Sequence, residues 1–157
     1  MILVFNFGGQ YAHLIARRVR DLGVKSELVF PDISANVVKN LNPDAIIFSG
    51  SPYSCYEKNA PVIDKKIYDL NIPILGICYG LQLMAYQLEG KVTSHISKQF
   101  GRENLKITKS KLFDGLSEDQ TVWFSHGDQV DKVPKGFEIT GSSKNAKVAA
   151  MENTKNI

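Results

Sequence analysis

The residues best suited to chemistry in this sequence form one short segment, Gly76-Ile77-Cys78-Tyr79-Gly80. A cysteine stands between two glycines where a buried apolar run gives way to a helical pattern. This is the spacing of a nucleophile elbow, with cysteine in place of serine. Such a turn needs small flanking residues because the chain folds tightly against itself there. We therefore predict that Cys78 is a nucleophile, and the alternative is a structural cysteine buried at the end of a core strand.

Backbone groups around the elbow offer a second element of catalysis. The N–H of Tyr79 stands at the start of the expected helix, where the helix dipole favours negative charge, so it can help to hold an oxyanion. The segment SGSPYS, residues 49–54, follows another buried run and makes a tight loop. Free N–H groups of Gly50 and Ser51 offer a second oxyanion donor, and a plain turn is the alternative.

A third segment, WFSHGDQV at residues 123–130, carries His126 directly after strand-like residues. A histidine beside glycine and aspartate serves as a catalytic base, a binding residue or a hydrogen-bonded structural residue. The local sequence does not choose among these roles.

The elements that must position these segments follow from hydrophobic spacing. Buried strands are predicted by apolar runs at 2–5, 26–30, 45–50 and 72–77, and helices by spacings at 11–22, 61–70 and 81–88. Strands that alternate with helices predict an α/β fold, with an open mixed, mostly parallel sheet that helices cover on both faces. Sites in such sheets form at the carboxyl ends of the strands. We therefore expect residues 6–11, 49–54 and 76–80 to converge.

The second half of the chain has a different pattern. Short strand-like segments at 91–96, 104–108, 121–126, 137–143 and 147–151 are separated by turn residues. They predict either a mixed extension of the first sheet or an antiparallel ribbon. The chain has no repeat and no linker, so we expect residues 1–157 to form a single domain.

Composition excludes several classes of function. The net charge of +3 is mild and its basic residues are scattered, which argues against nucleic-acid binding. No apolar run approaches the roughly 20 residues that a membrane span needs. Cys55 and Cys78 are too few for a disulfide framework, and Cys55 is expected to be an incidental loop thiol. We expect a cytoplasmic protein with free thiols and no metal site.

Together, the segments GICYGLQ, SGSPYS and WFSHGDQVDKVPKGFE resemble the class I, triad-type glutamine amidotransferases. The resemblance covers essentially the whole chain in the right order. The segments FNFGGQYAHLIARRVRDLGV and QFGREN narrow it to the branch that supplies ammonia for amination of xanthosine monophosphate (XMP) to GMP in purine biosynthesis. It implies a flavodoxin-like three-layer fold and a carbon–nitrogen ligase in which Cys78 forms a glutamyl thioester.

The resemblance also implies the remaining site residues. Backbone N–H groups of Tyr79 and of Gly50–Ser51 would form the oxyanion hole. Positions near the bound glutamine would be Gln82, Ser125, His126, Gly127 and Asp128. This domain would need no cofactor. ATP and Mg²⁺ would act in the partner, an ATP-pyrophosphatase that is either a separate subunit or a fused domain.

Two departures from the family pattern stand out. The loop usually reads Ser-Gly-Gly-Pro, and here Ser51 replaces the second glycine. The family's catalytic histidine and glutamate lie in a His-Pro-Glu segment about one strand beyond the final residues, and His13, His95 and His126 do not match it. We therefore expect that the C-terminal part of the domain is missing. The alternatives are a non-catalytic docking or regulatory subunit of the same fold, or another elbow-cysteine hydrolase.

Overall fold

The structure is a computed structural model that describes residues 1–108 and 110–153, with the side chains of residues 95–100 and 126 excluded. The chain forms two compact units that divide between Gln87 and Leu88. The grouping of both units into one domain stays a prediction.

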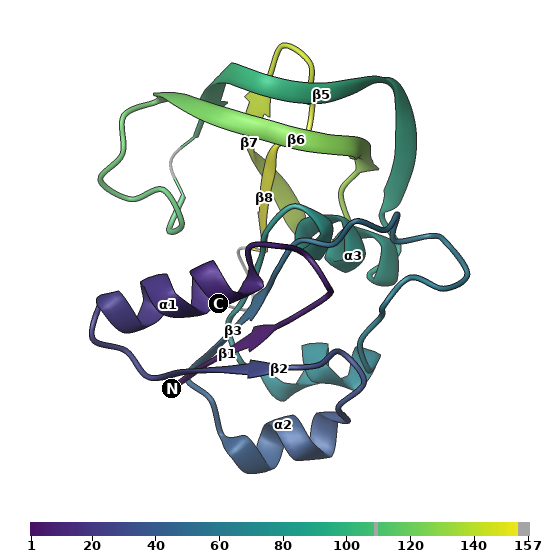
Figure 1. The fold of residues 1–157 in the computed structure, drawn as a ribbon. Helices are drawn as coiled ribbons and strands as arrows, with labels where there is room; N and C mark the ends of the chain where they lie inside the picture. The colour runs from purple at the N-terminus through teal and green to yellow at the C-terminus, as the bar shows by residue number, and fades with distance from the viewer. Residues whose placement is uncertain (109, 154–157) are drawn as a thin grey trace. The chain divides into compact units, whose positions relative to one another are not determined.

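The first unit is built on a parallel sheet of four strands in the order β2-β1-β3-β4 (Figure 1). The strands are β1 (Ile2–Phe5), β2 (Ser26–Val29), β3 (Ala45–Phe48) and β4 (Ile74–Gly76). Phe5 pairs with Phe48, and Phe48 with Gly76, so three strands end in one row. The predicted parallel sheet is confirmed, and its carboxyl edge is where the candidate segments begin.

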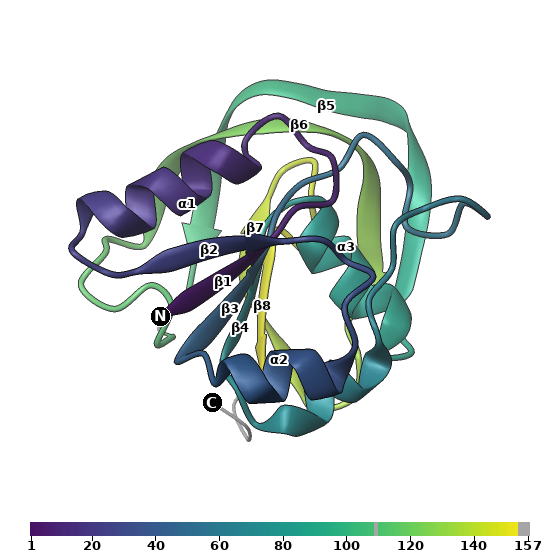
Figure 2. The same cartoon turned by 60° about the horizontal axis from the view of Figure 1, so that its bottom comes forward.

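Helices lie on both faces of this sheet, as the sequence predicted. The helical elements are α1 (Ala12–Asp21), α2 (Ala35–Leu41), the 3₁₀-helix η1 (Lys65–Leu70) and α3 (Tyr79–Gln87). Figures 1 and 2 show α1 and α2 on opposite sides of the sheet. The α/β class is therefore confirmed.

The two faces of the sheet carry different cores because successive strand residues point to opposite sides. On the α1 face, Val4 and Ile47 pack with Ala16 of the helix. On the other face the core is aromatic. Phe5 and Phe48 have ring centroids 5.2 Å apart, and Phe7 and Phe48 5.7 Å apart, both edge to face. Each such pair contributes about 1 kcal/mol beyond its buried area. The aromatic cluster supports the ends of β1 and β3, where the candidate site lies.

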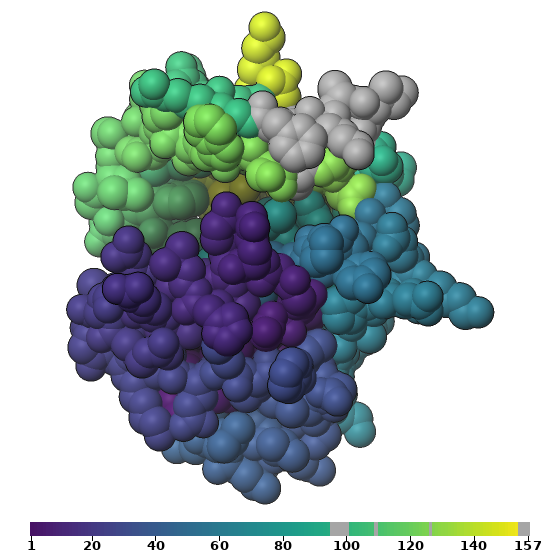
Figure 3. Space-filling model, in the orientation of Figure 1, coloured from purple at the N-terminus to yellow at the C-terminus, as the bar shows by residue number. Residues whose placement is uncertain are grey.

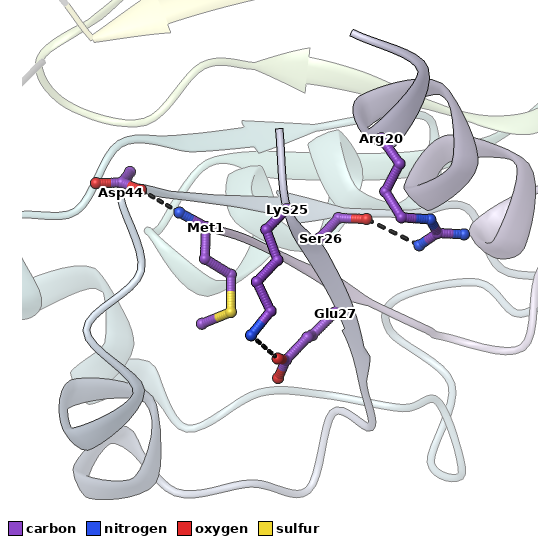
Figure 4. Close-up of polar contacts among 6 residues, drawn as sticks. All are labelled: Met1, Arg20, Lys25, Ser26, Glu27 and Asp44. Atoms are coloured by element: carbon purple, nitrogen blue, oxygen red, sulfur yellow. Dashed lines mark hydrogen bonds and ion pairs between the residues drawn. The ribbon is translucent and has the colours of Figure 1, made fainter. Parts of the chain in front are cut away.

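Polar contacts fix α1 to the amino end of β2 (Figure 4). Arg20 Nη1 donates to Ser26 Oγ at 3.0 Å, and Ser26 Oγ donates to the Ala16 carbonyl at 2.7 Å. The outer side of α1 is exposed, and the space-filling view shows this purple segment at the surface (Figure 3). The exposed residues include His13 and Arg17.

Two local predictions for the first unit need correction. The helix predicted over 61–70 is a 3₁₀-helix that begins only at Lys65. Asp64 has an extended backbone and its side chain accepts from the Lys66 N–H, so it caps a helix at that point. The sequence reasoning also missed α2, although Ser34 is its N-cap and accepts from the Val37 N–H.

The second unit is a four-stranded antiparallel sheet in the order β6-β5-β7-β8. Its strands are β5 (Lys91–Ile107), β6 (Asp119–Lys132), β7 (Phe137–Ser143) and β8 (Ala150–Asn153). Of the two predicted alternatives, the antiparallel one is confirmed. The segments at 91–96 and 104–107 belong to one long strand, which ends before Thr108. Among the described residues, no helix is long and apolar enough to cross a membrane.

Candidate active site

Cys78 lies in the turn between β4 and α3, with a φ of +54°. This left-handed conformation is unfavourable for a side-chain-bearing residue, costs about 1–2 kcal/mol, and is concentrated at functional sites. The residue is partly exposed. The structure therefore gives Cys78 the strained backbone that the elbow spacing predicted.

The two glycines of the elbow are sterically required. A Cβ on Gly76 would lie 2.7 Å from the Gly80 carbonyl carbon and the Leu81 nitrogen. A Cβ on Gly80 would lie 2.4 Å from the Phe48 carbonyl oxygen. Both distances are far below van der Waals contact. The prediction that these positions must be small is confirmed, and its reason is close packing of the elbow against itself and against β3.

The elbow is also hydrogen-bonded to the end of β3. The Ile77 N–H donates to the Phe48 carbonyl at 2.9 Å, and the Gly80 N–H donates to the Ser49 carbonyl at 3.1 Å. Tyr79, between them, is fully buried, and its hydroxyl donates to the Pro61 carbonyl at 2.6 Å. Burial raises the pKa of Tyr79 above its usual value. The Tyr79 side chain therefore anchors the first residue of α3 as a neutral phenol.

The loops after β1 and β3 meet the elbow at this edge of the sheet. A Cβ on Gly50 would be 3.9 Å from Cys78 Cβ, so this loop lies beside the candidate nucleophile. A Cβ on Gly9 would be only 2.3 Å from the Gly50 carbonyl oxygen. The predicted convergence of residues 6–11, 49–54 and 76–80 is confirmed.

Backbone donors are available in the loop after β3 and at the first residue of α3. Within the described part of the chain, the N–H groups of Gly50, Ser51 and Tyr79 donate to no acceptor. Ser51 is not among the residues with positive φ, so a side chain is compatible with the backbone at this position. These N–H groups lie on two neighbouring segments beside Cys78, and their role as an oxyanion hole stays a prediction.

The other predicted glutamine contacts are distributed over both units. Gln82 is buried on α3, and its N–H donates to the Cys78 carbonyl at 3.1 Å. The segment 125–128 belongs to β6, which continues beyond the strand predicted over 121–126. In the register, Ser125 pairs with Phe100 and His126 with Gln99. The pairing is irregular beyond His126, because the register shifts between Ser94 and Gln99. Ser125 is exposed and Asp128 is buried.

The His126 side chain lies outside the described residues, so its role stays a prediction, as do those of Ser125, Gly127 and Asp128. Of the other histidines, His13 is exposed on α1, and His95 belongs to β5.

Sequence reasoning missed one residue of this site, Ser49. Its side chain is fully buried, and its hydroxyl accepts from the Phe7 N–H at 3.4 Å. A polar residue at the end of a buried strand was the available signal. Because buried hydroxyls are normally hydrogen-bonded, the position of Ser49 indicated that its hydroxyl has a hydrogen-bond partner. The sequence did not indicate which residue that partner is.

Comparison with known proteins agrees with this geometry. The family described as "Glutamine amidotransferase class-I" matches residues 3–157. The chain belongs to this family. Among its curated relatives, proteins named "GMP synthase [glutamine-hydrolyzing]" from Lactobacillus acidophilus and Aquifex aeolicus are 51% and 50% identical over 97% of this chain. The chain spans only 30% of the length of each.

Solved structures show the same fold for this class-I amidotransferase. A candidate GMP synthase component from Thermoplasma acidophilum superposes with a TM-score of 0.86 and is 29% identical. That match covers 99% of this chain and 78% of the other. A glutamine amidotransferase from Thermotoga maritima gives a TM-score of 0.71 at 16% identity, covering 96% and 70% of the two chains. The second likeness concerns the fold alone.

Proposed function

We propose that this chain is the glutamine-hydrolysing component of a GMP synthase. The observation that carries the proposal is Cys78 at positive φ, between two glycines that cannot carry a Cβ and beside Gly50. Its substrate class is supported by relatives of about 50% identity that are named as glutamine-hydrolysing GMP synthases.

In the proposed reaction, the Cys78 thiolate attacks the side-chain amide carbon of glutamine. The carbonyl π-electrons move onto oxygen, where the Tyr79 N–H and the Gly50–Ser51 loop stabilise the negative charge. Collapse of this intermediate breaks the C–N bond, and the leaving nitrogen takes up a proton to depart as ammonia. Water then attacks the thioester, which releases glutamate and restores the thiol. Gln82, Ser125, His126, Gly127 and Asp128 are the proposed glutamine contacts.

The ammonia would serve a second active site in an ATP-pyrophosphatase partner, fused or separate, that activates XMP with ATP and Mg²⁺ in the cytoplasm. The family resemblance assigns the general base to a histidine, oriented by a glutamate, in a segment that follows residue 157. The gene sequence beyond that residue tests this assignment. A His-Pro-Glu triplet within about fifteen codons supports it, since one more strand and its loop span that length. Its absence there counts against it.

The experiment for this function uses full-length protein and the variants Cys78→Ala and Cys55→Ala. Release of glutamate from glutamine should disappear in the first variant and persist in the second, because Cys55 is buried and is not among the proposed site residues. Equal hydrolysis by Cys78→Ala and the parent would refute the mechanism.

A covalent probe separates the alternative functions. The diazoketone 6-diazo-5-oxo-L-norleucine, an electrophilic analogue of glutamine, should label Cys78. Failure to label would favour a non-catalytic subunit of the same fold. Turnover of small aldehydes or peptides in preference to glutamine would favour a different elbow-cysteine hydrolase.

A further inference from the structure

Two serine hydroxyls hold the loop after β3 against the loop after β1. Ser49 Oγ accepts from the Phe7 N–H at 3.4 Å, and Ser51 Oγ donates to the Phe7 carbonyl at 2.8 Å. Both backbone groups of Phe7 are therefore bonded by the residues that flank Gly50. Phe7 itself is fixed, because its buried ring packs on Phe48.

These contacts define the orientation of the Gly50–Ser51 peptide. Ser49 Oγ also donates to the Gly50 carbonyl oxygen at 3.2 Å, and Gly9 approaches the same oxygen closely. The Gly50 carbonyl is thus directed to the β1 loop. In a trans peptide the N–H points opposite to the carbonyl, so the Ser51 N–H faces away from that loop and stays available. The Ser51 hydroxyl accepts from the Tyr53 N–H at 3.3 Å, which fixes the far side of the turn.

We propose that Ser51, assisted by Ser49, is a positioning residue that fixes the Gly50–Ser51 peptide as an oxyanion donor by bonding both backbone groups of Phe7. The inference rests on the proposed glutaminase function, and it adds that this function requires the hydroxyl groups of Ser51 and Ser49. In this proposal the hydroxyls do not contact the substrate. They act through the peptide, whose donor must be in place before the negative charge forms, because a preorganised donor needs no rearrangement in the transition state.

The test compares Ser51→Ala, Ser51→Thr and Ser49→Ala in the full-length protein. Ser51→Ala keeps the backbone N–H and removes only the hydroxyl. It should lower kcat for glutamine hydrolysis about tenfold, with KM for glutamine within about twofold of the parent, because a transition-state interaction is lost. Ser49→Ala should likewise lower kcat and leave KM for glutamine nearly unchanged. Ser51→Thr retains a hydroxyl and should keep most of the parental kcat.

A matched control is Ser26→Ala, at the amino end of the sheet (Figure 4). Ser26 also donates to a carbonyl, that of Ala16, and accepts one bond, from Arg20. Its removal should lower the melting temperature about as much as Ser51→Ala and leave kcat unchanged. Parental kcat in Ser51→Ala, or an equal loss of kcat in Ser26→Ala, overturns the inference.

A second measurement separates oxyanion positioning from damage to the elbow. Alkylation of Cys78 by iodoacetamide displaces iodide and creates no oxyanion, so Ser51→Ala should react at the parental rate. A rate that falls in parallel with kcat means that the elbow itself has moved and refutes the proposal. The proposed function fails separately, if glutamine hydrolysis by the parent proves independent of Cys78.

Discussion

Gly80 of α3 packs against Phe48 of β3 so closely that a methyl group on its Cα would lie 2.4 Å from the Phe48 carbonyl oxygen and 2.6 Å from its Cβ. The helix that begins beside Cys78 is thus in direct backbone contact with the carboxyl end of β3, an inner strand of the sheet. The position of the candidate nucleophile depends on this contact.

Gly80→Ala should therefore displace the elbow. Overpacking at this point is expected to lower the free energy of unfolding by about 2 kcal/mol. A shift of the elbow of about 1 Å should reduce glutamine hydrolysis about 100-fold. Urea unfolding and a glutaminase assay measure the two effects.

Ala85→Gly, a buried position later in α3, is the matched control. It should lower helix stability by about 1 kcal/mol without crowding the elbow, and so keep the activity. If Gly80→Ala kept the parental activity, the close contact between Gly80 and Phe48 would not determine the position of the elbow.

The two cysteines should differ in reactivity. Cys55 is 2% exposed, whereas Cys78 is partly exposed in the elbow. Access is one requirement for thiol alkylation, so brief treatment of the folded protein with iodoacetamide should modify Cys78 and spare Cys55. Peptide mass spectrometry identifies the modified residue, and denatured protein should react at both. Preferential labelling of Cys55 in folded protein would show that the segment around it opens readily.

The carboxylate of Asp64 predicts a pH effect on stability. Its pKa is held below the usual value, first by the N–H of Ala35 at 2.9 Å and then by that of Lys66 at 3.1 Å. A carboxyl whose pKa is lower in the folded state stabilises the protein fully above its unfolded pKa, near 3.8. That contribution is lost as the pH falls through the lower, folded pKa.

The parent should therefore have a higher melting temperature than Asp64→Asn at neutral pH. This difference in melting temperature should decrease in acid, below the unfolded pKa of the carboxyl group. Melting curves from neutral pH to about pH 2.5, spanning the carboxylate range, measure it. Asp69→Asn removes the same charge from an exposed site on η1 and should give a smaller difference throughout. If the difference in melting temperature between the parent and Asp64→Asn were constant with pH, the hydrogen bonds to the charged Asp64 carboxylate would not be its cause.

Sequence patterns predicted the first unit well because apolar runs indicate buried strands and small residues indicate tight turns of the backbone. The run ILVF is β1, and Gly76 and Gly80 indicated a tight bend that the structure confirms. Apolar spacing did not separate a 3₁₀-helix from an α-helix at 61–70, because Ile63 and Ile67 are buried under either geometry.

The rest of the site depended on contacts that a sequence pattern does not contain. The hydrogen bonds between Phe7 and the hydroxyls of Ser49 and Ser51 join residues more than forty positions apart. The strand predicted over 121–126 stopped before Gly127 and Asp128 because glycine and aspartate favour turns, but the long ladder with β5 continues β6 through them. Long-range pairing overrode local preference there, as it commonly does in sheets.

The glycine contacts of the elbow also have a genetic consequence. At Gly76 the three atoms nearest to an added Cβ all belong to the backbone, and at Gly80 two of the three do. Trimming a neighbouring side chain cannot relieve such a clash. A suppressor of Gly80→Ala would have to shift β3 itself, and with it the Ser49–Ser51 loop. A selection for intragenic revertants should therefore return true reversion to glycine almost exclusively, whereas destabilised positions elsewhere in the first unit should accept compensating changes.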